Sequence, residues 1–208
     1  MDRIISLLIG YLFGCILPAD IVSRCFTGKP IREVGSGNPG MTNVLTNIGT
    51  LPGLLTLGGD ILKTALAMGL SFLLFGNAAG RICIHYAGFG AVLGHDFPFW
   101  RGWSGGKGVT VTCTWMILGF GLWGIFCELF GAITVFSTGW LPVAAVVIGA
   151  APVPMVFRLS GMEAGLLAMI SFILMLLKHI PGLGRIHRGE EPRRFQLWKR
   201  SEEPGGKS

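Results

Sequence analysis

The sequence predicts an all-α, polytopic membrane protein with about seven transmembrane helices, some of them short. Hydrophobic residues make up 51% of its 208 residues and charged residues only 13%, whereas about 25% of an ordinary soluble domain is charged. Glycine is also abundant, at 33 residues, and glycine within long apolar runs is typical of closely packed membrane helices. We therefore expect one integral membrane domain, residues 1–194, followed by a polar cytoplasmic tail, residues 195–208.

The first predicted span covers residues 4–22, and Pro18 and Asp20 interrupt it. Asp20 lies near the inner end of the span, where it either faces the loop that follows or pairs with Arg24. A cleaved signal peptide is the competing interpretation of this segment. The acidic Asp2 and the absence of an Ala-x-Ala-like cleavage site argue against that interpretation.

The second predicted span, residues 51–75, carries two ionisable residues, Asp60 and Lys63. Residues three apart lie on one helix face and can form an ion pair. Such residues inside a membrane indicate function by default, although a pair that only locks helix packing explains them nearly as well. Residues 82–93 follow as an apolar segment that is too short for a straight span, so we expect a short or re-entrant helix there.

The second half of the chain begins with an apolar run, residues 108–136, that is too long for one span. We divide it into two short helices that turn near residues 119–124, a glycine-rich stretch. Residues 140–157 and 161–177 form the last two predicted helices. Five helices, with the long run undivided and the short segment re-entrant, are the alternative to seven.

Basic residues predict the orientation, because they gather on the cytoplasmic side of membrane proteins. Eight of the 17 lie between Lys178 and the C-terminus, so we place the C-terminus in the cytoplasm and, with seven helices, the N-terminus outside. The inner loops then hold Lys29, Arg32, Arg101 and Lys107, whereas the outer segments hold only Arg3, Arg81 and Arg158. The tail suits anionic lipid headgroups, and nucleic acid is not an expected partner of so hydrophobic a chain.

Two uncharged or weakly charged glycine-rich stretches, residues 34–50 and 103–112, fall on this predicted cytoplasmic face. Glycine lets backbone N–H groups approach an anion, and small hydroxyl and amide side chains add hydrogen bonds. The first stretch offers, as candidate ligands of an oxyanion or phosphate, Gly35, Ser36, Gly37, Asn38, Gly40, Thr42 and Asn43. We predict that both stretches line one site at the membrane surface.

The second stretch contains Lys107 between Gly105, Gly106 and Gly108, directly before a predicted helix. A lysine charge, free N–H groups and a helix N-terminus together suit a phosphate. The pattern is not a P-loop, because the GxxxxGK[ST] spacing is absent. Alone it is equally well explained as a flexible basic turn, and the pairing with the first glycine-rich stretch favours the phosphate site.

Further candidates lie beside these stretches and before the tail. His95 closes the short apolar segment, where it serves as acid, base or phosphate donor, or only bonds a backbone carbonyl. His179 opens the tail region, followed by Arg185 and Glu191. Arg185 suits recognition of phosphate, although lipid anchoring is the commoner role of an arginine beside a membrane. No metal-ligand spacing appears, so neither a metal nor a cofactor is expected.

Three motifs resemble the bacterial acyl-phosphate:glycerol-3-phosphate acyltransferases of the PlsY type. Residues 35–44, GSGNPGMTNV, look like the GSGNxGATN signature of that family. Residues 94–98 with residues 105–109 are similar to its second motif, GHxFP…GGKGVAT, and residues 179–191 resemble its third, HxxNxxRLxxGxE. The motifs occur in the family's order and spacing, and the resemblance covers nearly the whole chain.

The resemblance implies an enzyme of the bacterial cytoplasmic membrane, acting at the cytoplasmic face as a monomer. It implies transfer of a fatty acyl group from acyl phosphate to the 1-hydroxyl of glycerol 3-phosphate, which gives lysophosphatidic acid and phosphate for phospholipid biosynthesis. The implied catalytic residues are Ser36, His95, Lys107 and His179, and the remaining candidates bind substrate. Acyl phosphate is already activated, so no Ser or Cys nucleophile is needed.

Two positions depart from the family pattern: Thr46 stands where an arginine is usual, and Gly182 where the third motif has asparagine. A phosphate-bound arginine is worth about 1.5–3 kcal/mol, so either Arg101 or another basic group compensates, or the acceptor differs, or the chain is a paralogue with little activity. A small transporter also shows polar glycine breaks, but with paired inverted halves. A non-enzymatic scaffold leaves the GGKG and GHxFP motifs without a task.

Overall fold

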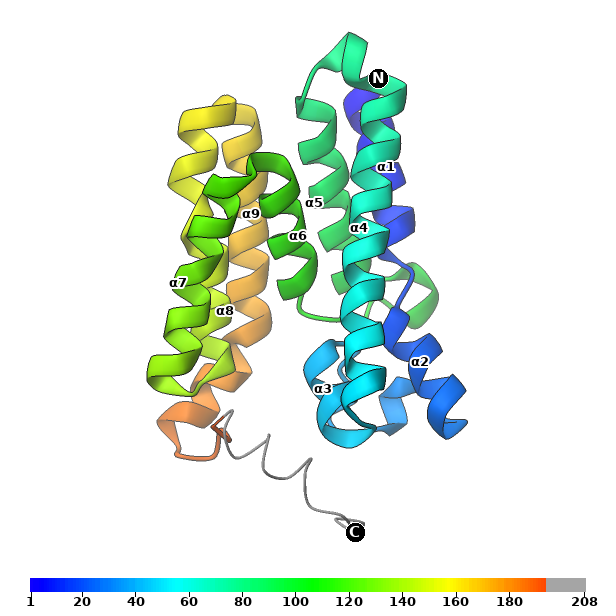
Figure 1. Cartoon of the computed structure of the whole chain (residues 1–208), viewed down its shortest axis with the longest axis vertical. Coiled ribbons are helices and arrows are strands. Elements are labelled where there is room, and N and C mark those ends of the chain that lie inside the picture. The colour runs from blue at the N-terminus through cyan, green and yellow to red at the C-terminus, as the bar shows by residue number, and fades with distance from the viewer. Residues whose placement is uncertain (194–208) are drawn as a thin grey trace.

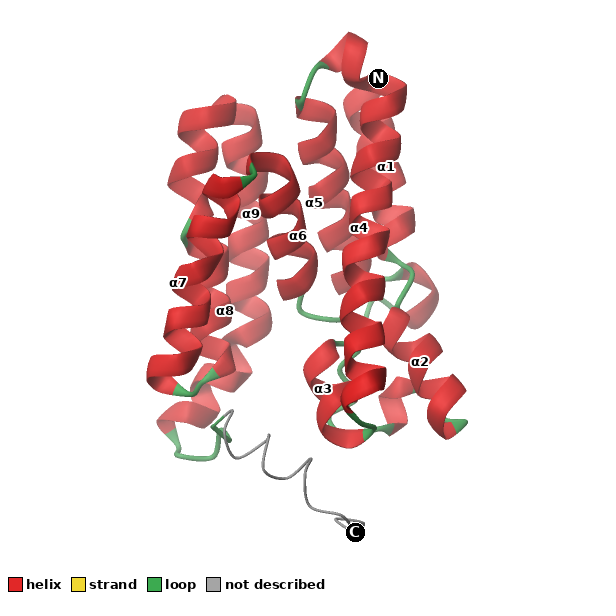
Figure 2. Ribbon diagram, viewed as in Figure 1, coloured by secondary structure: helices red, strands yellow, loops and turns green. Residues whose placement is uncertain are grey.

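The computed structural model describes residues 1–193, and its regular structure in that range is entirely helical (Figures 1 and 2). The predicted all-α fold is therefore confirmed, while the predicted tail, residues 195–208, lies outside the described residues. The α-helices are α1 Asp2–Gly14, α2 Pro18–Thr27, α3 Met41–Asn47, α4 Thr50–Ala79, α5 Ile82–Asp96, α6 Val109–Phe120, α7 Leu122–Thr138, α8 Leu141–Ala150 and α9 Pro152–His187, with 3₁₀ turns at Ile31–Glu33 and Phe99–Arg101.

Three helical stretches are long and apolar enough to cross a membrane: Asp2–Thr27, Thr50–Ala79 and Leu141–His187. The apolar helices Val109–Phe120 and Leu122–Thr138 are shorter. Large apolar side chains cover the outer surface of the bundle; Leu73, for example, is 83% exposed. Such a surface is stable only against lipid, because soluble proteins rarely expose large contiguous apolar patches.

The first predicted span is broken where the proline occurs. Leu17 is extended, with φ −108° and ψ 94°, and Pro18 begins α2, because proline fits the first turn of a helix but not its interior. The break leaves carbonyl groups of α1 without helical partners. Lys63 of α4 fills this gap: its Nζ donates to the oxygens of Gly14, at 3.2 Å, and Ile16, at 2.8 Å.

Helix α5 lies at the centre of the molecule, and α1 packs against it through small residues. A Cβ atom on Gly10 or Gly14 would overlap the backbone of Ala87 or Ala91 of α5. The two helices can therefore approach closely only because these positions have no side chain, as is usual for small-xxx-small contacts in membranes. This packing buries nearly all of α5, which explains why so short a segment is so apolar.

Glycines set the turns in the second half of the chain. Gly121, at φ 58°, separates α6 from α7, so the predicted division of residues 108–136 is confirmed. Within α9, Gly161 has φ 81° and ψ −175°, and a Cβ on Gly165 would meet the ring of Phe157. Gly165 and Phe157 are close to each other because the chain reverses at Gly161, which lies between them.

After this reversal, α9 runs past the predicted end at residue 177 to His187. The last turns of this helix therefore carry His179 and Arg185, which the sequence analysis placed after the last predicted helix. Figure 1 shows the end of α9 and the α2–α3 region at the same end of the bundle, with the connection between α5 and α6 between them. The three motifs consequently share one end of the molecule.

Candidate active site

The first glycine-rich loop is organised around the side chain of Asn43. Its Oδ1 accepts hydrogen bonds from the Ser36 N–H and the Asn47 Nδ2, both at 3.0 Å. Its Nδ2 donates to the oxygens of Val34, at 2.9 Å, and Asn38, at 3.1 Å. Both donors and both acceptor positions of the amide are thereby used. Asn43 therefore shapes the loop, and its predicted contact with substrate stays a prediction.

Glycines make this folded loop possible. Gly35 and Gly37 have φ values of +54° and +71°, a backbone region that side chains disfavour. A Cβ on Gly35 would also collide with the amides of the two asparagines at its back. The loop leaves Ser36 and Thr42 exposed, so their hydroxyl groups are available to a ligand. Gly40, another candidate from the sequence, directly precedes α3.

The second loop folds back onto the end of α5. The Gly105 N–H donates to the Asp96 oxygen at 3.1 Å, and the Gly106 N–H donates to the His95 oxygen at 2.9 Å. A Cβ on Gly106 would overlap the His95 imidazole, and Gly108 has φ +71° directly before α6. Glycine is thus required by close contact in the loop and by backbone conformation at its end.

His95 belongs to a buried network with Lys63 and Asp60. The His95 Nδ1 lies 2.9 Å from the Lys63 Nζ, which is 2.8 Å from the Asp60 Oδ1. An ammonium group only donates, so Nδ1 accepts and the ring proton is on Nε2. His95 therefore presents an N–H donor on the side of the second loop. The intramembrane pair holds helices together and also orients a predicted site residue.

Lys107, in the second loop, lies near the charged residues at the end of α9. Burial lowers the pKa of its ammonium group, the positive charge of Arg185 lowers it further, and Glu191 opposes this change. The Arg185 Nε lies 2.6 Å from the Glu191 Oε2. Two cations thus share one nearby carboxylate, so the site has positive charge left for an anionic ligand.

His179 faces the same group of charges but has the opposite hydrogen-bonding character to His95. Its Nδ1 lies 2.8 Å from the Met175 oxygen, and a carbonyl only accepts, so the ring proton is on Nδ1. The Nε2 atom therefore carries a lone pair. Lys107 and Glu191 lie close enough to act electrostatically on this ring, and the histidine is buried.

Sequence reasoning named Arg101 as one candidate to compensate for the arginine missing at position 46, and it did not assign Lys178 to the site; the structure shows that both connect its parts. The Arg101 Nη2 donates to the Gly37 oxygen at 3.2 Å and so ties the second loop to the first. The Lys178 Nζ donates to the Asp96 oxygen at 2.9 Å and lies 4.3 Å from the centre of the Phe97 ring, which ties α9 to the second loop. A basic residue between the GHxFP and GGKG motifs was the only signal available in the sequence.

The two departures from the family pattern have different surroundings. The Thr46 hydroxyl, in α3, is buried and has no hydrogen-bond partner within the described residues. A Cβ on Gly182 would lie 2.7 Å from the Pro142 Cγ, which is closer than carbon atoms pack. The start of α8 therefore occupies the space that a side chain at position 182 would need.

Comparison with known proteins gives relatives along nearly the whole chain. A family model described as glycerol-3-phosphate acyltransferase matches residues 4–189. The glycerol-3-phosphate acyltransferase 1 of Lactobacillus johnsonii is 37% identical over 188 residues, which cover 86% of this chain and 85% of the relative. The glycerol-3-phosphate acyltransferase of Paramagnetospirillum magneticum is 33% identical over 193 residues, which cover 93% and 94%.

The fold is also similar to that of solved structures. A crystal structure of PlsY (YgiH), an integral membrane glycerol 3-phosphate acyltransferase, in its glycerol 3-phosphate form has a TM-score of 0.82 and 24% identity, and the match covers 93% of this chain and 96% of that one. The lysophosphatidic acid form of PlsY has a TM-score of 0.81 and 21% identity. From the family model and the full-length relatives, this chain belongs to the glycerol-3-phosphate acyltransferase family, as its three motifs predicted.

Proposed function

We propose that this protein transfers a fatty acyl group from acyl phosphate to the 1-hydroxyl of glycerol 3-phosphate and releases lysophosphatidic acid and inorganic phosphate. The observation that carries the proposal is the meeting of Lys107 and Arg185, from two distant motifs, beside two histidines of opposite hydrogen-bonding character. The curated relatives are named for glycerol 3-phosphate, and PlsY has been crystallised in glycerol 3-phosphate and lysophosphatidic acid forms.

The charges suit two substrates that both carry phosphate. Lys107 and Arg185 bind phosphate oxygens, with the guanidinium offering several donors in a fixed plane. Exposed Ser36 and Thr42 supply hydroxyl groups from the first loop. Arg101, whose side chain reaches that loop, stands in for the arginine that the family carries at position 46.

The reaction needs orientation and charge stabilisation more than a protein nucleophile. The 1-hydroxyl oxygen of glycerol 3-phosphate attacks the acyl carbonyl carbon, and the carbon–oxygen bond to phosphate breaks. The electron pair of that bond leaves on the phosphate, which takes up the hydroxyl proton. Lys107 stabilises the departing negative charge, His95 donates its Nε2 proton as a hydrogen bond to an anionic oxygen, and the His179 Nε2 accepts from the attacking hydroxyl and orients it.

The site would lie at the cytoplasmic face of a bacterial inner membrane, with seven helices crossing and the N-terminus outside. Basic residues support this orientation: Lys29 and Arg32 follow α2, and Arg101 and Lys107 lie between α5 and α6. Figure 1 shows both connections toward the end of the bundle where α9 ends. The turns at Gly121 and Gly161 divide the second half into antiparallel segments, which supports seven crossings over five. A monomer is sufficient, since every proposed site residue comes from one chain.

The test is acyl transfer by purified protein in detergent with palmitoyl phosphate and radiolabelled glycerol 3-phosphate. Replacing Lys107 with Ala should lower kcat/KM about a hundredfold, because a charge-assisted contact of this half-buried side chain, worth about 3 kcal/mol, is lost. Lys29→Ala is the matched control, since Lys29 is exposed outside the site and its loss should leave the rate unchanged. Equal rates in wild type and Lys107→Ala would refute the assigned site.

Two further arms test the substrates. Palmitoyl coenzyme A replaces palmitoyl phosphate in one arm, and transfer from the thioester alone would refute the donor. Other polyol phosphates replace glycerol 3-phosphate in the second arm, because Thr46 and the closed space at Gly182 leave fewer groups for that acceptor. Transfer only to another polyol phosphate would support an acyltransferase but refute glycerol 3-phosphate as its acceptor. No transfer to any polyol phosphate would refute the acyltransferase function.

A further inference from the structure

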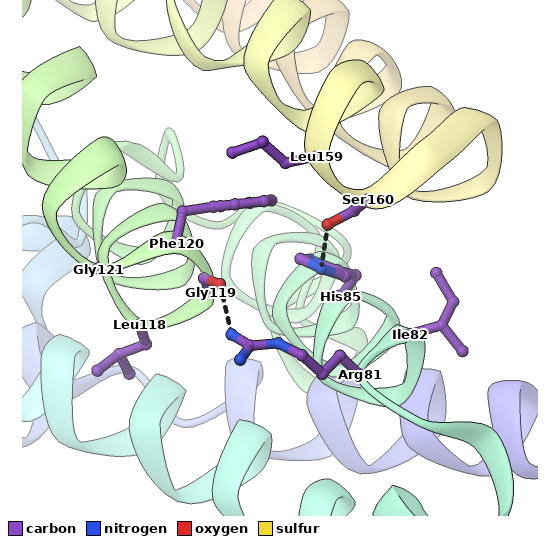
Figure 3. A pocket seen from close by; sticks show the side chains of 9 residues that line it. All are labelled: Arg81, Ile82, His85, Leu118, Gly119, Phe120, Gly121, Leu159 and Ser160. Carbon is purple, nitrogen blue, oxygen red and sulfur yellow. Dashed lines mark hydrogen bonds between the residues drawn. The ribbon is translucent and has the colours of Figure 1, made fainter.

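A second pocket, drawn in Figure 3, lies where α5 begins and α6 ends, and Figure 1 shows this at the end of the bundle opposite the three motifs. Its volume is about 620 Å³. It is formed at the start of α5, the end of α6 and the part of α9 before Gly161, and α5 separates it from the catalytic loops by 15 residues, about 22 Å of helix. None of its lining residues belongs to the three motifs.

A histidine with a fixed proton position forms the floor of this pocket. The Trp115 Nε1 donates to the His85 Nδ1 at 3.2 Å, and an indole N–H cannot accept. The His85 proton is therefore on Nε2, which lies 3.2 Å from the Ser160 Oγ. Ser160 accepts this hydrogen bond, so its own proton remains available to a ligand. His85 cannot act as a base toward Ser160, and the pair is a donor site rather than a nucleophile.

Arg81 supplies a positive charge at the same pocket. Its Nη2 donates to the Gly119 oxygen at 2.8 Å, and Figure 3 shows Arg81 and Ser160 on either side of His85. This bond uses one of the five guanidinium N–H groups. The ion pairs found among residues 1–193 do not include Arg81, and no acidic side chain lines the pocket.

The remaining walls are apolar and open toward the surface that faces lipid. Leu118 is 48% exposed and Leu159 is 54% exposed, and both line the pocket with Ile82 and Phe120. A free ion would leave these side chains uncovered. A ligand that fits both the polar side chains Arg81 and Ser160 and the apolar walls has an anionic headgroup and an apolar chain.

We propose that this pocket binds the phosphate headgroup of an anionic membrane lipid, from the leaflet opposite the active site. Arg81 and the Ser160 hydroxyl donate to the phosphate oxygens, and an acyl chain covers Leu118 and Leu159. The position lies at a membrane interface, where an arginine and a phosphate form a charge-assisted contact. The proposed ligand is a phospholipid with two acyl chains, which is neither substrate nor product of the proposed acyl transfer.

The test is native mass spectrometry of the detergent-purified protein titrated with phosphatidylglycerol. Arg81→Gln should weaken lipid binding about tenfold to a hundredfold, as expected for a lost charge-assisted contact, and Ser160→Ala should weaken it less. Arg158→Gln is the matched control, because Arg158 lies two residues before Ser160 on α9 but does not line the pocket. Its lipid binding should equal that of the wild type.

Inorganic phosphate is titrated in a separate arm, and full competition by phosphate at equal concentration would overturn a lipid ligand. Unchanged binding in both Arg81→Gln and Ser160→Ala would overturn the site. Lys107→Ala should bind phosphatidylglycerol like the wild type, while both pocket variants should keep the wild-type acyl-transfer rate. Failure of lipid binding and failure of the proposed catalysis are thus separate results. Should Arg81→Gln fold poorly, Arg81→Lys keeps the charge and should retain part of the affinity.

Discussion

Replacing Lys63 with Met should affect both stability and the catalytic loop, because this ammonium group contacts two different parts of the fold. It donates to two carbonyl oxygens at the break between α1 and α2, and to the His95 Nδ1. It also pairs with Asp60 inside the helix bundle, where Lys63 and Asp60 side chains are 4% and 2% exposed. Methionine has a similar length and apolar character but provides no donor.

The magnitude follows from what the substitution leaves behind. Removing one partner of a buried ion pair leaves an unpaired charge and typically costs 3–5 kcal/mol. The Asp60→Asn substitution should cost a similar amount, because it leaves the ammonium group without its counter-charge. In the double variant no charge remains, so its loss should be smaller than the sum of the single losses by about 0.5–3 kcal/mol. Reversible unfolding in mixed micelles measures all four free energies.

A second readout separates orientation of His95 from stability alone. Nitrogen NMR of labelled histidine should show the wild-type His95 protonated on Nε2. Lys63→Met should move the proton toward Nδ1, because the donor to Nδ1 is lost and the Asp60 Oδ1, an acceptor, lies 3.5 Å from that atom. We expect kcat of the folded variant to fall while the KM for glycerol 3-phosphate changes little. If Lys63→Met had the wild-type unfolding free energy and the wild-type His95 tautomer, the network would be refuted. If the free-energy loss of the double variant equalled the sum of the two single losses, the coupling between Lys63 and Asp60 would be refuted.

Two further predictions concern the phosphate contacts. Arg101→Gln removes the bond to the Gly37 oxygen and should raise the KM for glycerol 3-phosphate about tenfold, measured by steady-state kinetics; a rise equal to that of an Arg32→Gln control would contradict the role. Lys107 must be protonated to act, and burial and Arg185 lower its pKa, so activity should fall with rising pH below the value of about 10.4 for a free lysine. Lys107→Arg keeps its charge and should shift this limb to higher pH; an identical limb in a pH–rate profile would exclude Lys107 as the titrating group.

Local sequence patterns were sufficient for the elements and motifs that depend on near neighbours. The run at residues 108–136 exceeds one membrane thickness, and its glycines indicated the turn that the structure places at Gly121. Pro18 indicated the break in the first span. Helix α9 was predicted to end at residue 177, but it continues to His187 through Pro181 and Gly182, two residues that have low helix propensity.

Contacts between distant segments could not be read from the sequence. Asp20 was left between two partners, and the structure shows that it has both: its Oδ2 pairs with Arg24 and its Oδ1 accepts from the Ile31 N–H. Arg101 reaches a loop 64 positions earlier in the chain. The Asp20–Arg24 pair has the i,i+4 spacing of a helix face, whereas the contacts of Asp20 with Ile31 and of Arg101 with Gly37 have no such spacing and depend on how the segments pack.

The two histidines show why residue type alone did not define the chemistry of the site. Both were predicted from motifs, but their roles depend on the partner of Nδ1. An ammonium group donates to the His95 Nδ1, whereas the His179 Nδ1 donates to a carbonyl. The first ring therefore offers a proton at Nε2 and the second offers a lone pair. The proposed mechanism uses both, a donor to the growing negative charge and an acceptor for the attacking hydroxyl, and the buried Lys63 distinguishes the first ring from the second.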